Sequence, residues 1–220
     1  MHANSGDTSG DHSRVVGYGA VIFYDHLLGQ ADPPDDAAAA LSPAEKSELL
    51  KIARESVESY VRTGKAPQIT TKDPRLNETQ GAFVTLTEHG ALRGCIGNII
   101  GREPLSATVR DMAVAAASHD PRFSPVAAAE LKDISIEISV LSAPRRVKDA
   151  SQIQLGRHGV IVNRGGHQGV FLPQVARETG WNKEEFLSEL CAQKAGLPPD
   201  AWKDPKTALY VFTADVFAEK

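Results

Sequence analysis

Hydrophobic positions repeat with a helical period over residues 42–64. Ser42, Pro43 and Glu45 stand where an N-cap, a first helical residue and the reciprocal partner of a capping box belong. Gly64 follows at the position of a C-terminal cap. Apolar residues occupy one helical face between these ends: Leu49, Leu50, Ile52, Ala53, Val57, Tyr60 and Val61. The pattern predicts a helix that buries this face against a core.

From Phe83 the apolar pattern changes to that of a hairpin followed by helices. The stretch "AFVTLTEHGALRGCIG" predicts two strands that turn at His89-Gly90. A helix follows Pro104, and the stretch "SPVAAAEL" predicts a short second helix over Ser124–Leu131. Residues 133–142 then alternate strictly between apolar and polar, as a half-buried strand does.

The same order of elements is predicted a second time in the C-terminal half. "HGVIVNRGGHQGVFL" predicts a hairpin that turns at Arg164–His167, and two helices follow it. Cys191 lies at core spacing on the second of these helices, so we interpret it as a packing residue. Residues 207–217 predict one closing strand. The two passages together predict an α+β fold with an internal duplication of a three-strand, two-helix unit.

The N-terminal segment differs from this body. Residues 13–24, "SRVVGYGAVIFY", are apolar and β-prone, and a single strand cannot bury itself. Residues 27–40, "LLGQADPPDDAAAA", carry paired prolines and aspartates that break regular structure. We therefore predict a linker at 27–40 and a domain over 41–220, preceded by a strand taken from another sheet.

Composition narrows the class of protein. The 220 residues carry a formal net charge of −4, and no basic run exceeds Arg145-Arg146, so nucleic acid is disfavoured as a partner. No apolar run approaches the roughly 18 residues of a membrane helix, so no membrane partner is predicted. Two cysteines without a CxxC motif do not make a disulfide framework, which favours a reducing cytoplasm.

Cys95 in "LRGCIG" is the first candidate for chemistry. Its neighbours Gly94 and Gly97 permit close backbone approaches, and strand alternation places Arg93 on the same face as the thiol. A cationic neighbour would favour the thiolate, which is the nucleophilic form. Cysteine is equally a small buried hydrophobe. From spacing alone the structural alternative is favoured, because no catalytic signature fits.

Two further clusters carry polar residues. In "SHDPRFSP", Asp120 and Arg122 predict a turn in which the two pair, or a loop that presents Arg122 and His119 to an anion. His158 begins a strand and is the candidate base for Cys95; the alternative is a strand-edge histidine bound to a backbone carbonyl. His158, His167 and Cys95 have no recognised metal-ligand spacing, so we predict neither a metal nor a cofactor.

These motifs together resemble the AMMECR domain family, whose bacterial members are called AmmeMemoRadiSam system protein A. The resemblance rests on "LRGCIG", "DPRFSPV", "ELKDISIEISVLS", "GVFLPQVARETGW" and "FLSELCAQKAGL", in that order across residues 41–218. It implies two repeats that form one curled sheet. It also implies a role beside a Memo-type protein and a radical S-adenosylmethionine enzyme as partners. The stretch "NSGDTSGDHSRVVGYGAVIF" resembles the C-terminal end of Memo-type proteins, so we interpret residues 1–26 as a Memo remnant.

Two hypotheses for function follow. In the first, Cys95 acts as a thiolate with His158 or His119 as base on a small anionic substrate. The resemblance then implies a pocket formed by the matching motif residues Arg93, Gly94, Asp120, Arg122 and Phe123. In the second, the domain is a non-catalytic module that binds a ligand or docks a Memo-type partner. An exposed Cys95 beside an imidazole would favour the first hypothesis, and a buried Cys95 walled by aliphatic side chains the second.

Overall fold

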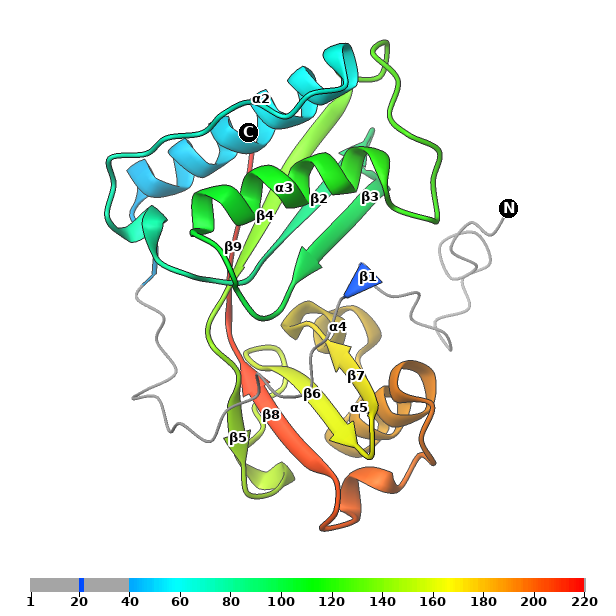
Figure 1. Ribbon diagram of the computed structural model, residues 1–220. Helices are drawn as coiled ribbons and strands as arrows, with labels where there is room; N and C mark the ends of the chain where they lie inside the picture. The colour runs from blue at the N-terminus through cyan, green and yellow to red at the C-terminus, as the bar shows by residue number, and fades with distance from the viewer. Residues whose placement is uncertain (1–19, 22–39, 220) are drawn as a thin grey trace.

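The computed structural model describes residues 20–21 and 40–219 (Figure 1). Its α-helices are α2 (Pro43–Thr63), α3 (Leu105–Ser118), α4 (Pro173–Thr179) and α5 (Lys183–Glu189), and α5 continues into a π-helix, η4 (Leu190–Ala195). Its strands are β1 (Ala20–Val21), β2 (Ala82–Glu88), β3 (Ala91–Asn98), β4 (Ile134–Leu141), β5 (Arg145–Val147), β6 (Gly159–Arg164), β7 (His167–Phe171), β8 (Ala208–Phe212) and β9 (Ala214–Ala218). Short 3-10 turns lie at Arg75–Asn77, Ala150–Gln152 and Ala201–Lys203. The α+β class expected from the sequence is confirmed.

The strands form two sheets instead of the single curled sheet expected from the resemblance. One has the order β1-β3-β2-β4-β9 and the other β5-β8-β6-β7 (Figure 1). Two chain segments run through both sheets, because β4 leads into β5 and β8 leads into β9. The sheets separate where Ser142 and Thr213 bond to each other in place of the regular ladder: the Ser142 amide donates to the Thr213 carbonyl, and the Thr213 amide donates to the Ser142 hydroxyl. The predicted closing strand is therefore two strands in two sheets.

Both sheets share one strand order. The hairpin β2–β3 is extended by β4 in the first sheet, and the hairpin β6–β7 is extended by β8 in the second. Each sheet is completed by the strand that follows the other half, β9 in the first and β5 in the second. The strand order thus agrees between the halves, but the second helix predicted for the first half does not form. The duplication of a three-strand, two-helix unit stays a hypothesis.

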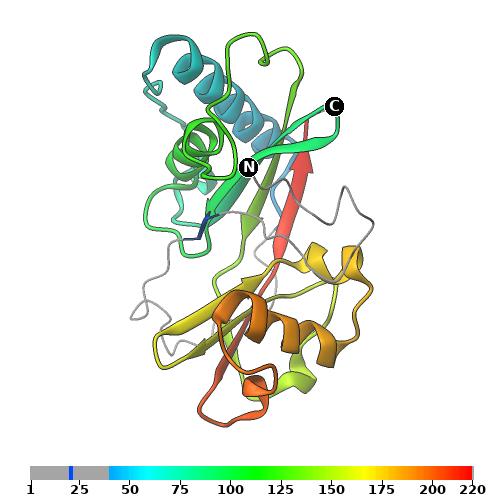
Figure 2. The same cartoon turned by 90° about the vertical axis from the view of Figure 1, so that its right-hand side faces the viewer.

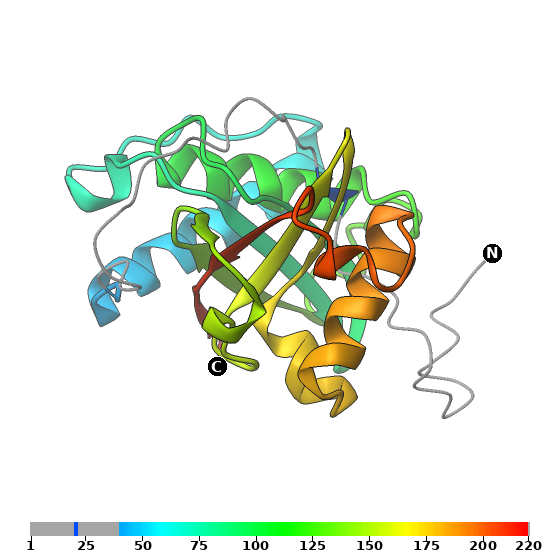
Figure 3. The same cartoon turned by 90° about the horizontal axis from the view of Figure 1, so that it is seen from below.

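Helices cover the outer face of each sheet, so the domain has four layers. Figure 3 shows α2 and α3 on one side, α4 and α5 on the opposite side, and the sheets between them. One apolar cluster fills the space between α2, α3 and the first sheet, and a second lies under α4, α5 and η4. A third cluster lies between the two sheets; it includes Phe83, Cys95, Ile161, Tyr210 and Phe212. Figure 2 shows the two halves stacked from another side.

Local signals set the helix ends. Ser42 and Glu45 form the predicted capping box of α2, and Gly64 closes it with φ 71°. Asn182 and Glu185 form a second capping box at α5. Within residues 40–219, no helix combines the length and the hydropathy needed to cross a bilayer.

The short helix predicted over Ser124–Leu131 is wrong. Residues 128–133 form turns, and the segment before them is irregular. Arg93 takes the carbonyl oxygens of Ser124 and Pro125, which a helix would need for its own amides. The Glu130 carboxylate accepts from the Ala127 amide and binds Arg93 as well. Tertiary contacts to β3 therefore replace the local helix.

The predicted boundaries at 1–26 and 27–40 fall almost entirely outside the described residues. The exception is β1, whose two residues pair in parallel with β3, Ala20 opposite Ile96 and Val21 opposite Gly97. This pairing adds a strand to the edge of the first sheet beside the "RGCIG" motif.

Candidate functional site

Cys95 lies in the interior of β3, on the face turned toward the second sheet. Its side chain is fully buried in the cluster between the sheets, with Phe83, Leu141 and Phe212 among the members. The Thr85 hydroxyl on β2 lies 3.3 Å from the Cys95 Sγ. Burial raises the pKa of the thiol to about 11, although the Thr85 hydrogen bond and the charge of Arg122 act in the opposite direction. At neutral pH the sulfur is a thiol and not a thiolate.

The predicted base does not share a hydrogen bond with this thiol. His158 is 1% exposed, and its Nδ1 accepts from the Gln154 amide at 3.1 Å. His119 is exposed, and its Nδ1 lies 2.7 Å from the Ser118 hydroxyl. This geometry favours the structural alternative for Cys95. His158 binds backbone at a strand edge, but through an amide and not through the carbonyl that the alternative named.

Asp120 and Arg122 hold the backbone of Cys95 from outside the sheet. The Cys95 amide donates to Asp120 Oδ2 at 2.9 Å, and Arg122 Nη2 donates to the Cys95 carbonyl at 3.4 Å. Arg122 also binds both carboxylate oxygens of Asp120, at 2.9 and 2.7 Å. Burial alone would raise the pKa of Asp120, but the hydrogen bonds from Arg122 and from the Cys95 amide hold it below its usual range. We call these three residues the β3 clasp. The predicted pairing of Asp120 with Arg122 is confirmed.

Strand alternation predicted that Arg93 shares a face of β3 with the Cys95 thiol. The structure shows a different arrangement. The β2–β3 register shifts between Leu86 and Thr87, so a β-bulge at Arg93 interrupts the alternation. Arg93 instead binds the Glu130 carboxylate at 2.7 and 3.2 Å. Phe123 lies near both guanidinium groups, 6.0 Å from that of Arg93 and 5.4 Å from that of Arg122.

Gly94 is required by packing and not by turn geometry. A Cβ built on Gly94 would lie 2.2 Å from the Ala116 carbonyl oxygen of α3. A side chain there would force α3 away from β3. The residues that the resemblance implied as a pocket thus lie around β3. Each of the two arginines pairs with a carboxylate, and Gly94 allows α3 to pack closely against β3.

Sequence reasoning missed a set of charged residues between the two halves. Glu137 on β4 is half-buried opposite Thr85; burial raises its pKa, and the nearby Glu178 of α4 adds to the rise. Lys194 of η4 lies 5.9 Å from the centre of the Phe171 ring; its pKa is lowered by burial and further by Arg122. The sequence did contain a signal for Glu137, because it is the single charged residue in the otherwise uncharged strand "ISIEISVL".

Comparison with known proteins assigns the chain to a family. The model of the AMMECR1 family matches residues 50–217, which include β3 and the clasp. The chain is a member of the AMMECR1 family. A Pyrococcus furiosus protein is 45% identical over 184 residues, which cover 78% of this chain and 87% of the relative. A Methanothermobacter thermautotrophicus protein is 44% identical over 188 residues, which cover 82% and 97%.

A solved structure has the same fold. The crystal structure of an uncharacterised Pyrococcus horikoshii protein matches with a TM-score of 0.74 and 41% identity, over 79% of this chain and 90% of that chain. AMMECR1 membership thus establishes family and fold. It assigns no reaction, so the role of the clasp and of the β3 edge must be argued from geometry.

Proposed function

We propose that this AMMECR1 domain is a non-catalytic docking module that accepts an extended segment of a Memo-type partner at the outer edge of β3. The partner, and a place beside a radical S-adenosylmethionine enzyme, come from the family resemblance. The docking mode comes from the geometry of the "RGCIG" strand. The observation that carries the proposal is the parallel pairing of Ala20–Val21 with Ile96–Gly97.

The edge of β3 is divided into a closed part and a receptive part. The Cys95 amide and carbonyl point away from β2, and the clasp binds both. Unpaired edge groups invite strand addition, so the bond from the Cys95 amide to Asp120 closes that donor, while the Cys95 carbonyl keeps a second lone pair for an added strand opposite Ile96. Alternate residues of a strand direct their backbone groups to the same edge, so Gly97 presents its amide beyond the closed donor. An added strand can therefore pair with the Cys95 carbonyl and the Gly97 amide.

The sequence around Ala20–Val21 has the chemistry that strand addition needs. Residues 13–24 are apolar and β-prone and resemble the C-terminal end of a Memo-type protein. Main-chain hydrogen bonds supply affinity in β-augmentation, and alternate side chains supply specificity. In this chain β1 would occupy the edge from within the same molecule; a separate Memo-type protein would offer the same segment from another.

The thiol-enzyme hypothesis has less support. A nucleophile acting at neutral pH needs a lowered pKa and access to substrate, whereas burial raises the pKa of Cys95 to about 11. An anionic substrate needs an unbalanced cation, whereas Arg122 binds Asp120 and Arg93 binds Glu130. These contacts support a structural role for the motif over a reactive centre.

A peptide titration tests the docking proposal. The full chain carrying Ala20→Pro and Val21→Pro should lose the β1 pairing, because proline lacks the amide donor that the ladder to β3 needs. A fluorescent peptide with the sequence of residues 13–24 should bind this variant and raise its anisotropy. The unchanged chain should bind the peptide at least about tenfold more weakly, since its own segment competes at a high effective concentration.

The matched control is the same peptide with prolines at the positions of Ala20 and Val21. It should bind neither chain. Failure of the unmodified peptide to bind the variant would overturn the proposal, and so would equal binding of the two peptides.

A further inference from the structure

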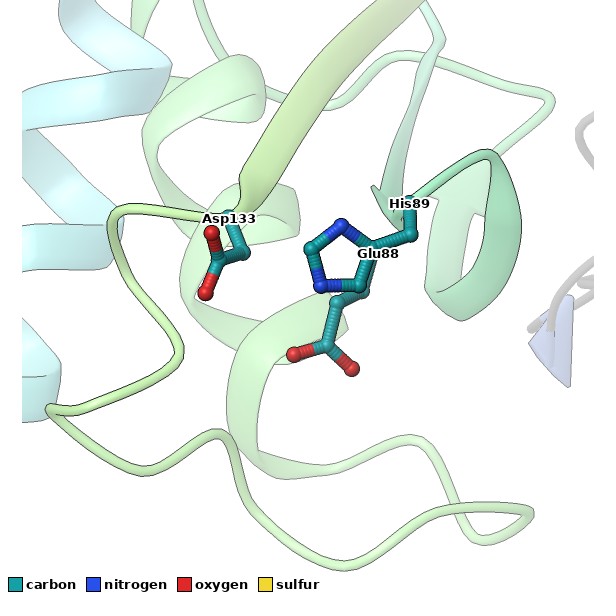
Figure 4. A group of neighbouring side chains, drawn as sticks. All are labelled: Glu88, His89 and Asp133. Carbon is teal, nitrogen blue, oxygen red and sulfur yellow. The ribbon is translucent and has the colours of Figure 1, made fainter.

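Three metal-binding side chains converge at the far end of the β2–β3 hairpin. Glu88 is the last residue of β2, His89 is the first residue of the turn, and Asp133 immediately precedes β4. Their ligand atoms all lie within 4.8 Å of one another (Figure 4). We propose that Glu88, His89 and Asp133 form a binding site for a divalent transition metal of the zinc class.

The backbone brings the three residues together by register. Glu88 pairs with Ala91 across the hairpin and with Ile134 on β4, so the residue before Ile134 lies beside the hairpin end. His89 has φ 51° and is the one non-glycine residue with a positive φ in the described part of the chain. Gly90 follows with φ 81°, which makes the two-residue turn typical of a tight hairpin. Figure 4 shows the imidazole next to both carboxylates, with the three side chains arranged as a triangle.

Protein contacts do not account for this convergence. Among the residues that the structure describes, no hydrogen bond or ion pair of 4.0 Å or less joins His89 to Glu88 or to Asp133. Asp133 has one ion pair, at 3.8 Å from Lys132, whose side chain is 81% exposed. The groups are thus near enough to share one ion after small side-chain movements, yet they do not neutralise each other directly.

The donor set selects the class of metal. One imidazole nitrogen with two carboxylate oxygens suits Zn²⁺ and its neighbours in the first transition row, whereas Mg²⁺ and Ca²⁺ prefer oxygen ligands alone. Three protein ligands leave a fourth position for water or for a ligand from another molecule. His89 is exposed, so the ion would be reached from solvent.

A bound ion would add a second contact between the β2–β3 hairpin and the segment 124–133, which already contacts β3. Glu130, three residues before Asp133, binds Arg93 at the bulge of β3. An ion between Asp133 and the hairpin would add a second fastening, so the segment 124–133 would be held at both Arg93 and His89. The site is separate from the β3 edge that carries the proposed docking function.

Zn²⁺ titration of the full chain by calorimetry tests the proposal. His89→Asn removes the nitrogen ligand and suits the turn, since asparagine adopts positive φ readily. Glu88→Gln and Asp133→Asn each remove a charged ligand with little change of shape. Each of the three should raise the Zn²⁺ dissociation constant at least about tenfold. His167→Asn, in the other hairpin, is the matched control and should leave it unchanged.

A gain-of-affinity variant keeps the test valid if one of these chains fails to fold. Lys132→Ala removes the cation that competes for Asp133, so it should lower the dissociation constant by roughly two- to tenfold. The chain has seven histidines, so the variants decide where Zn²⁺ binds. The proposal is overturned if the unchanged chain binds no Zn²⁺ at about 1 mM, the affinity of a very weak site. It is equally overturned if all variants bind as the unchanged chain does.

Discussion

Replacing Asp120 by alanine should destabilise the domain far more than loss of an ordinary surface ion pair. The Asp120 side chain is 2% exposed and accepts from the Cys95 amide, the Arg122 amide and two guanidinium nitrogens of Arg122. Asp120→Ala leaves the Cys95 amide without its acceptor and removes the carboxylate that pairs with Arg122.

The expected magnitude follows from these contacts. Removing one partner of a buried ion pair costs roughly 3–5 kcal/mol, much of it from the charge left behind. The Arg122 side chain remains 23% exposed, so water can solvate part of that charge. We therefore expect Asp120→Ala to lower the free energy of unfolding by about 2–4 kcal/mol.

Urea unfolding followed by circular dichroism measures this free energy. Asp111→Ala is the matched control, because Asp111 also pairs with a neighbouring arginine but has a side chain that is 40% exposed. The control should lose no more than about 0.5 kcal/mol. A loss below about 1 kcal/mol for Asp120→Ala, with an unchanged slope against urea, would refute the role given to the clasp.

The same carboxylate predicts a pH dependence. The pKa of Asp120 is lowered in the folded chain, so its stabilisation is present above the ordinary aspartate pKa of about 3.9. That stabilisation is lost as the pH falls through the folded-state pKa. Asp120→Asn should therefore flatten the acid side of the stability profile, and an unchanged profile would contradict the lowered pKa.

Three more measurements test separate parts of the site. At about pH 7.5, iodoacetamide should label Cys95 in the folded chain roughly 100-fold more slowly than in the unfolded chain, because the folded thiol has a pKa of about 11. Equal labelling rates would support the hypothesis that Cys95 is a nucleophile. Gly94→Ala should cost more than about 2 kcal/mol by urea unfolding, since its Cβ meets the Ala116 carbonyl. Unchanged stability would contradict the close packing. Burial raises the pKa of Glu137 in the folded chain, so the unchanged chain should lose stability as the pH rises above the ordinary glutamate pKa. Glu137→Gln should abolish this loss. A loss that persists in the variant would have to come from another group.

Elements set by neighbours in the chain were predictable. The capping box at Ser42 and the turn at His89 depend on residues within a few positions of each other, and both formed as expected. The helix over Ser124–Leu131 had equally good local signals and did not form, because Arg93 takes the carbonyls that the helix would use. Local propensity is overridden where a charged side chain from another element competes for the backbone.

The state of Cys95 could not be read from its flanking residues. Its burial depends on the second sheet, which brings Phe212 and Tyr210 against β3 from more than a hundred residues away in the chain. The bulge that turns Arg93 toward Glu130 likewise arises from sheet register. The "RGCIG" motif marks a special strand, but only the packing of the two sheets decides that the thiol is buried.

Hydrogen exchange at two neighbouring amides tests the docking edge most directly. Gly97 points its amide to the edge where β1 pairs, whereas Ile96 points its amide toward β2. NMR exchange rates should therefore be compared between the unchanged chain and the variant with Ala20→Pro and Val21→Pro. We expect the Gly97 amide to exchange at least about tenfold faster in the variant while the Ile96 amide keeps its rate. A Gly97 rate that is the same in both chains would contradict strand addition at this edge.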